Sequence, residues 1–401
     1  MNKKPLIITI SVALLIILGA VGWYFYTRSA TPDELIPVNG GLPFGAGSGN
    51  LSPGTPGGET SSNPTLGENG KPTAKLFRIS DVPVGGFVSF LKGGFTYVRY
   101  IDRATGHIYD VNPATLEKIQ VTNNTMPKIY EAYFKSDASG AVVRSIKDGS
   151  DTIDNMILTL TPPKATSTAA LYTVGSALLR GAIGEVTVAT DNTLLYTTND
   201  TGSIIRSTFS ADKPVSLFTS AFTDWRLSPS GIVTTKASAG VLGYSYVLGA
   251  KGGLTKILGP LDALVVLPNK DNKRIAYSYR DAEGAVLRAL NTTTKSAVDI
   301  VPSTLSEKCS WSTKLPDTLY CGVPTGGVGA SEPDSWYQGS THFSDRIWRF
   351  NTATGFTDVL VDPKKDLNVE IDIENPTLSP DEDYLVFMNK NDLTVWTLKL
   401  N

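Results

Sequence analysis

The chain has 401 residues, with 36 Lys and Arg against 38 Asp and Glu, and a formal net charge of −2. This balance lacks the basic excess of a nucleic-acid-binding protein, so no nucleic-acid partner is expected. An apolar fraction of 41% is too low for a protein with many membrane spans, and two Cys with two His favour neither a disulfide-rich scaffold nor a zinc cluster. No metal and no cofactor is predicted.

The N-terminus predicts a membrane anchor. Residues 1–5 carry Lys3 and Lys4, whereas residues 6–26 carry no charge and end in four aromatic residues that favour a membrane interface. A helix over these roughly 21 residues, rising about 1.5 Å per residue, crosses a hydrocarbon core of about 30 Å. The positive-inside rule places residues 1–5 in the cytoplasm as a short stub. We therefore expect a single-pass protein of the cell membrane with the bulk of its chain extracytoplasmic.

A cleavable signal peptide is the alternative interpretation of this segment. Signal peptides have an apolar core of about 7–15 residues, followed by a small-x-small cleavage site. The run here is longer, and the −3 positions before Ala20 and Ala30 hold Leu18 and Arg28, which favours a retained anchor. Residues 27–74 are rich in Gly, Pro, Ser and Thr. They predict a flexible linker, because they cannot bury enough apolar surface to offset the entropy of ordering.

Residues 75–401 contain a repeated hairpin. In each copy an alternating apolar strand is followed by an Asn-led turn and a second short strand. The three clearest copies are residues 107–121, 286–301 and 346–361. The alternation is typical of half-buried strands, and Asn side chains form hydrogen bonds with the backbone of such turns.

A second pair of strands precedes these hairpins. Its turn is clearest at Ser379-Pro380-Asp381 and at Ser228-Pro229-Ser230, which lie between apolar runs and are typical of type I turns. The unit therefore has four strands, which we term a to d. Most intervals between the starts of successive units are near forty residues, which is the length of a β-propeller blade. The first strands of successive units are expected to begin near residues 84, 128, 185, 222, 261, 306 and 372.

The two ends of this region predict how the ring closes. The last unit has strands at 372–378, 384–388 and 393–398 but lacks a d strand, whereas residues 74–80 resemble a d strand without a unit. Pairing these ends completes the last blade. The predicted fold is all-β: a seven-bladed β-propeller of four-stranded blades over 75–401, closed by an N-terminal d strand and preceded by one transmembrane helix and a disordered linker.

The Ser-Pro-Asp/Ser turns and the apolar strands after them resemble the TolB-like, or WD40-like, β-propeller repeats of bacterial envelope proteins. The resemblance covers most of residues 75–401. The copy at Ser228 keeps the Gly of the family pattern as Gly231, whereas the copy at Ser379 has Glu382 at this position. The resemblance implies a fold and a binding role rather than an activity.

Cys309 and Cys321 fall on strands a and b of the sixth unit. A turn at residues 314–317 folds this hairpin about Leu315 and places the two Cys opposite each other, at a Cα separation of about 5 Å that a disulfide can bridge. An extracytoplasmic compartment permits oxidation. A disulfide is therefore favoured over two buried thiols.

The largest departure from the repeat is residues 324–343, between strands b and c of the sixth unit. Long loops in compact domains often carry function, and this one is expected to overhang one face of the ring. Its aromatic and polar side chains are suited to stacking on a sugar or a peptide. The alternative is that Trp336 and Phe343 pack the loop onto its own blade. The candidate binding residues are Trp336, Tyr337, Gln338, His342 and Phe343.

An acidic run follows the sixth unit. Its carboxylates lack the order of an EF-hand, so a solvated loop is favoured over a calcium site. The residues are Asp362, Asp366, Glu370, Asp372 and Glu374.

The leading hypothesis for function is a non-catalytic binding or scaffold module that takes a protein or an envelope polymer as its partner, because a tether raises the effective concentration of a binder near the membrane. The alternative is a glycan-active hydrolase or lyase with its site at the channel mouth, which needs paired carboxylates or a Tyr nucleophile. The channel lining discriminates between them. Converging carboxylates or an Arg cluster favour an enzyme, and a mixed aromatic and polar rim favours a binder.

Overall fold

The computed structural model describes residues 67, 72–147, 149–150, 152–164 and 171–401. All of these residues fall in one compact unit, Glu59–Asn401. The predicted membrane helix at 6–26 and most of the linker at 27–74 lie outside them. In the part of the chain that is described, no helix is long and apolar enough to span a bilayer.

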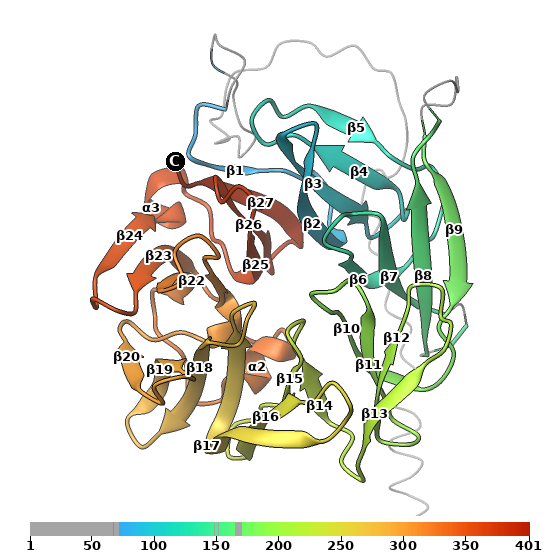
Figure 1. Ribbon diagram of the computed structural model, residues 1–401. Helices are drawn as coiled ribbons and strands as arrows, with labels where there is room; N and C mark the ends of the chain where they lie inside the picture. Colours follow the sequence, from blue (N-terminus) through green and yellow to red (C-terminus); the bar gives the residue numbers. More distant parts are fainter. Residues whose placement is uncertain (1–66, 68–71, 148, 151, 165–170) are drawn as a thin grey trace, which may run out of the picture. The chain divides into compact units, whose positions relative to one another are not determined.

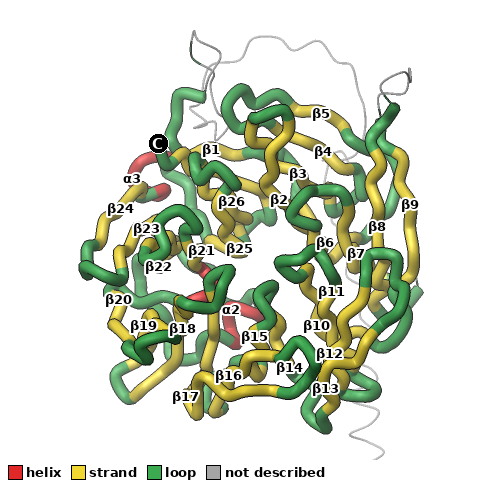
Figure 2. The backbone as a smooth tube through the Cα atoms, viewed as in Figure 1, coloured by secondary structure: helices red, strands yellow, loops and turns green. Residues whose placement is uncertain are grey.

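The described residues form antiparallel sheets placed side by side around a central axis (Figures 1 and 2). Three of the four-stranded sheets follow one another in the first part of the unit. They are β2 (Val84–Lys92), β3 (Phe95–Asp102), β4 (Ile108–Val111) and β5 (Lys118–Gln120); β6 (Ile129–Phe134), β7 (Gly140–Ile146), β8 (Ile153–Thr161) and β9 (Thr173–Leu178); and β10 (Ile183–Val188), β11 (Leu194–Thr198), β12 (Ser203–Ser207) and β13 (Val215–Thr219).

A seven-stranded sheet comes next, because one long strand serves two units. This strand, β17 (Leu254–Pro268), pairs with its predecessor up to Asp262 and with its successor from there to its end. The register shifts between Asp262 and Val265, and Ala263 has a positive φ of 52° at this bend. The other strands of this sheet are β14 (Trp225–Leu227), β15 (Ile232–Thr235), β16 (Leu242–Leu248), β18 (Arg274–Asp281), β19 (Gly284–Asn291) and β20 (Ala297–Ile300).

The last two sheets have four strands each. One contains β21 (Cys309–Trp311), β22 (Thr318–Pro324), β23 (Asp345–Asn351) and β24 (Thr357–Val361). The other joins the two ends of the unit, in the order β1 (Leu76–Arg78), β27 (Thr394–Lys399), β26 (Tyr384–Asn389) and β25 (Ile373–Leu378). Leu76 lies opposite Leu398 and Arg78 opposite Trp396. The predicted pairing of residues 74–80 with the C-terminal strand is confirmed.

Apolar side chains fill the contacts between neighbouring sheets. One cluster joins Phe77 and Val395 of the closing sheet to Val98 and Tyr100 of β3. Clusters of the same kind lie between every later pair of neighbouring units, including the two units that share β17. Because each square ångström of apolar surface removed from water contributes roughly 25 cal/mol, these contacts hold the sheets around the axis.

The turns use the chemistry expected from the sequence. The side chain of Asn351 accepts hydrogen bonds from the backbone N–H groups of Ala353 and Thr354, and Asn112 and Asn291 form equivalent turns. Glu382 takes a left-handed φ of 53°, at the position where Gly231 has a φ of 82°. The carboxylate of Glu382 accepts hydrogen bonds from residues 312–314 of the neighbouring sheet, which stabilises this conformation.

Candidate functional site

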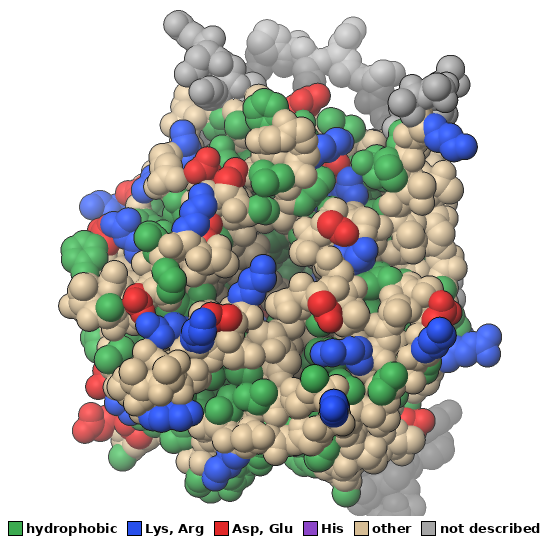
Figure 3. Space-filling model, viewed as in Figure 1, with side chains coloured by type: hydrophobic (Ala, Val, Ile, Leu, Met, Phe, Trp, Pro, Cys, Tyr) green, Lys and Arg blue, Asp and Glu red, His purple; other side chains and the backbone are tan. Residues whose placement is uncertain are grey.

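Charged side chains gather where the innermost strands face the central axis. Strands β2, β6, β10 and β25 border the opening of the ring in Figure 1. In the space-filling view the centre of this face is hollowed, with positive and negative side chains interspersed around it (Figure 3). The predicted channel is therefore lined by ionisable groups of both signs.

The first part of this lining comes from β6 and β7. Arg144 donates to Glu131 over 2.9 Å and to the carbonyl of Gly184, in the next sheet, over 3.0 Å. The hydroxyl of Tyr133 donates to the same carboxylate of Glu131 over 3.0 Å. Burial raises the pKa of Tyr133 well above its usual value, and the charge of Glu131 adds to this. Tyr133 is thus a neutral hydrogen-bond donor at physiological pH.

A cavity of 150 Å³ continues the lining. Glu185 of β10, Arg226 of β14, Glu307 and Tyr337 contribute side chains to it. Arg226 lies 3.4 Å from a carboxylate oxygen of Glu185, and its guanidinium lies 5.0 Å from the centroid of the Tyr337 ring. One carboxylate oxygen of Glu307, in the short 3₁₀ helix η1 (Ser306–Lys308), is buried without a hydrogen-bond partner.

The cavity changes the protonation of its acidic groups. Burial raises the pKa of Glu307 and of Glu185, and the positive charge of Arg226 opposes this rise at both residues. Burial also raises the pKa of Tyr337 well above its usual value. The cavity therefore offers carboxyl groups that take up protons more readily than exposed Glu, next to a guanidinium that donates hydrogen bonds.

The insertion at 324–343 supplies one wall of this cavity. Its short helix α2 (Asp334–Tyr337) lies within the ring in Figures 1 and 2. The carboxylate of Asp334 accepts a hydrogen bond over 2.6 Å from the backbone N–H of Ala239, in the connection between β15 and β16. The insertion thus reaches from the sheet of β21–β24 to a different sheet.

The five candidate residues of the insertion divide into two groups. Trp336 and Phe343 are only 2% and 8% exposed, and the indole N–H of Trp336 donates to the carboxylate of Asp372 over 2.9 Å. Their burial agrees with the alternative in which they pack the loop onto the protein. Gln338 and His342 are exposed, and Tyr337 is half-buried in the cavity. Binding by these three residues stays a prediction.

The acidic run is not a uniformly solvated loop, so this prediction is wrong for Asp372. Its side chain is fully buried and lies 2.5 Å from the ammonium of Lys308. The sequence interpretation failed because the partners of Asp372 come from distant segments. Glu374 lies 3.2 Å from Lys390, and Asp362 accepts from the backbone of Lys365 at the start of helix α3 (Pro363–Leu367). In the described residues no group of three or more His, Cys, Asp or Glu is placed to hold a metal ion.

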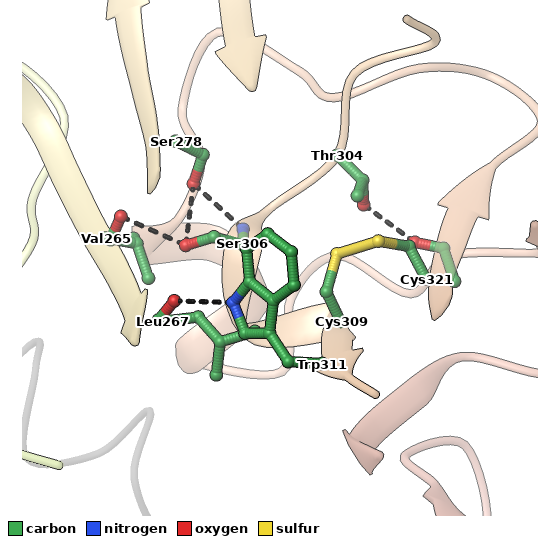
Figure 4. Close-up of a disulfide and its surroundings, with 9 residues drawn as sticks. Val265, Leu267, Ser278, Thr304, Ser306, Cys309, Trp311 and Cys321 are labelled. Carbon is green, nitrogen blue, oxygen red and sulfur yellow. Dashed lines mark hydrogen bonds between the residues drawn. A yellow bond between two sulfur atoms is a disulfide. The ribbon is translucent and has the colours of Figure 1, made fainter. Parts of the chain in front are cut away.

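Cys309 and Cys321 form the expected disulfide (Figure 4). They lie directly opposite each other in the pairing of β21 with β22, with Cα atoms 4.0 Å apart. The indole N–H of Trp311 donates to the carbonyl of Leu267 over 3.1 Å, which ties this hairpin to β17. The bridge therefore fixes the strands from which the insertion departs.

Sequence reasoning missed the charged residues of the channel. A usable signal existed, since a charged residue stands second or third in the first strand of several units. Glu131 is third in β6, Glu185 third in β10, Arg226 second in β14 and Glu374 second in β25. Because first strands border the axis, aligning the units on this position indicates the channel lining.

No family model and no curated protein matches the sequence. Among solved structures, the chain is similar to the β-propeller domain of the trilobed protease from Pyrococcus furiosus, which is described as having an open velcro topology. The TM-score is 0.51 at 9% identity, and the match covers 79% of this chain and 96% of that one. The match to an oligogalacturonate lyase in complex with manganese has a TM-score of 0.48 at 10% identity and covers 80% of this chain and 97% of that one. The match to TolB from Acinetobacter baumannii has a TM-score of 0.40 at 14% identity and covers 76% of this chain and 63% of that one.

The similarity to the propeller domain of the trilobed protease concerns the fold. Together with the four-stranded antiparallel sheets around a common axis, it identifies the protein as a β-propeller, which confirms the fold implied by the sequence repeats. At identities this low, the activities of the similar proteins do not transfer to this chain.

Proposed function

We propose that the protein is a membrane-tethered, extracytoplasmic β-propeller that binds a protein or an envelope polymer at the channel mouth beside the 324–343 insertion. The observation that carries this proposal is the division of the insertion into buried anchors and presented groups. Trp336 and Phe343 hold it in place, while Gln338 and His342 reach solvent. A loop that is already ordered loses little conformational entropy when it binds.

We further infer that the propeller has seven blades. The support is that β17 ends one four-stranded unit and begins the next, and that β1 supplies the fourth strand of the sheet that contains the C-terminus. The tether rests on the uncharged run at 6–26 and the Gly- and Pro-rich segment after it. Such a tether holds the binding face near the membrane and raises the effective concentration of envelope ligands.

A glycan-active hydrolase or lyase is the second candidate. It is favoured by the convergence of Glu185, Glu307 and Tyr337 on one cavity, which meets the requirement for paired carboxylates near the channel. Binding is preferred because the charge of Arg226, which lies beside Glu185, opposes the raised pKa that the general acid of such an enzyme needs.

The binding proposal is tested by crosslinking in intact cells with the full-length chain, followed by pull-down. The double variant Gln338→Ala, His342→Ala alters only exposed side chains, so it should fold normally and lose the captured partner. The matched control is Leu315→Ala, which changes an exposed residue on the turn between β21 and β22 and should keep the partner. Equal capture by both variants would contradict the proposed site.

The enzyme candidate has a separate readout. Purified envelope polymer is incubated with the full-length protein, and soluble saccharide fragments are measured. Fragments released by the wild type but not by Glu307→Gln would favour the enzyme over the binder. The tether is tested by membrane fractionation of cells that express the chain with and without residues 6–26. Recovery of both forms in the soluble fraction would contradict an anchor.

A further inference from the structure

A second group of ionisable side chains lies behind the insertion and is separate from the cavity. Lys308, Asp345 and Asp372 all have side chains with 0% exposure. The Nζ atom of Lys308 lies 2.8 Å from Oδ2 of Asp345 and 2.5 Å from Oδ1 of Asp372. Three different segments supply these groups, namely η1, the first residue of β23 and the residue before β25. One amine and two carboxyl groups therefore meet inside the protein without contact with solvent.

The insertion covers this group with apolar surface. The Nζ atom of Lys308 lies 4.7 Å from the centroid of the Trp336 ring and 5.0 Å from that of Phe343. The two rings pack on each other with Leu305. The ammonium of Lys308 also donates to the backbone carbonyl of Ile373 over 2.9 Å. The insertion and the start of β25 thus hold this nitrogen in a fixed position beside both carboxyl groups.

The two carboxyl groups differ in their hydrogen bonds. That of Asp372 accepts from the indole N–H of Trp336 at both oxygens and from the backbone N–H of Phe343 over 3.0 Å at Oδ2. Fixed donors of this kind stabilise negative charge that develops on a carbonyl oxygen under attack. Asp372 is therefore the carboxyl group prepared for attack by the amine.

Asp345 is suited to a different task. Its Oδ2 accepts from the backbone N–H of Ile373 over 2.7 Å, whereas its Oδ1 is buried without a partner. Burial raises the pKa of Asp345 to about 6, opposed by the charge of Lys308. A carboxyl group that gains and loses a proton this readily, beside both reactants, can carry protons between them.

We propose that Lys308 and Asp372 form an intramolecular isopeptide bond, with Asp345 as the group that transfers protons. The ammonium of Lys308 passes a proton through Asp345 to the carboxylate of Asp372. The amine nitrogen then attacks Cγ of Asp372 and forms a carbon–nitrogen bond. The nitrogen gives up a second proton, the carbon–oxygen bond breaks, and the hydroxyl leaves with that proton as water. One ammonium and one carboxylate disappear together, nothing is oxidised or reduced, and Asp345 returns to its starting state.

The bond has a structural consequence. It links residues 64 apart in the chain and joins the segment before β21 to the segment before β25. Lys308 is also the neighbour of Cys309, so the amide and the disulfide together fix both the hairpin and the sheet beside it. Formation of the bond requires no ligand, so the inference stands apart from the proposed function.

The test is the intact mass of the full-length chain, purified in detergent and reduced to open the disulfide. The expected mass is lower than the sequence mass by one water molecule. Tandem mass spectrometry of a digest should then identify a branched peptide that joins the segments containing Lys308 and Asp372. The full sequence mass in folded protein would overturn the proposal, and a branch at Asp345 would overturn the assignment of Asp372.

Variants distinguish the formation of this bond from other reactions that release water. Lys308→Arg keeps the charge but cannot form the amide, so it should show the full sequence mass. Asp345→Asn removes the proton carrier and should show mostly unlinked chain. Lys295→Arg, at an exposed turn, is the matched control and should keep the loss of water. Formation of the disulfide between Cys309 and Cys321, measured before reduction, checks that each variant has folded. A loss of water that persists in Lys308→Arg would overturn the proposal.

Discussion

The carboxyl group of Glu307 lies in the channel cavity with one oxygen that accepts no hydrogen bond. Burial raises its pKa, and the charge of Arg226 only partly opposes this rise. Between the usual pKa and the raised one, the folded protein binds more protons than the unfolded chain. The free energy of unfolding therefore falls as pH rises through that interval, because ionised Glu307 is tolerated better in the unfolded chain.

Replacing Glu307 with Gln removes this titration while keeping the size of the side chain. As the pH rises above the usual pKa of a Glu side chain, we expect the wild type to lose stability relative to Glu307→Gln. The measurement is the free energy of unfolding by urea for both proteins at a series of pH values. A difference between them that stays constant with pH would show that the environment of Glu307 does not penalise its charge.

At the scale of elements, the close approach of two neighbouring sheets depends on a glycine. A Cβ atom built on Gly86 of β2 would lie 2.0 Å from the carbonyl oxygen of Ala132 in β6. This distance is shorter than any normal contact, and the obstacle is backbone rather than a flexible side chain. The first strands of two units therefore pack against each other only because position 86 lacks a Cβ.

We expect Gly86→Ala to separate β2 from β6 and to destabilise the protein by about 1–3 kcal/mol, the usual cost of overpacking a core. The matched control is Gly326→Ala in the insertion, where an added Cβ meets nothing within 4 Å. Denaturant midpoints of the two variants check this prediction. If Gly86→Ala is as stable as Gly326→Ala, the sheets have room to move apart without loss.

The elements that the sequence predicts well are those specified by local chemistry. Strand alternation and Asn-led turns place the repeated hairpins, and the register of a tight hairpin places Cys309 opposite Cys321. The channel groups are marked only by a charge near the start of several first strands, and the contacts of the buried amine and of the insertion follow no local rule. Lys308 and Asp372 are 64 residues apart, and Asp334 contacts Ala239 across 95 residues. Such pairs depend on how whole sheets are placed around the axis, which no periodicity in the chain encodes.

At the scale of the whole molecule, the ring depends on one short strand from the start of the unit. Leu76 belongs to the apolar cluster on one side of the closing sheet, and Phe77 belongs to the cluster on the other side. Both side chains are 2% exposed. Strand β1 therefore completes two contacts between sheets at once, and its loss exposes the edge of β27 as well as both clusters.

A truncation that begins after Ser80 should therefore destabilise the entire propeller, since removing one large buried side chain alone costs about 2–5 kcal/mol. The backbone N–H of Ile79 also donates to the carbonyl of Val395 in β27. In the truncated protein we therefore expect faster hydrogen exchange along β27 than along strands of distant sheets. The control is a truncation that begins at Thr73, which keeps β1 and should preserve the denaturant midpoint. Equal midpoints for the two truncations would mean that the ring is stable without this closure, and that its other contacts between sheets suffice to hold the ends together.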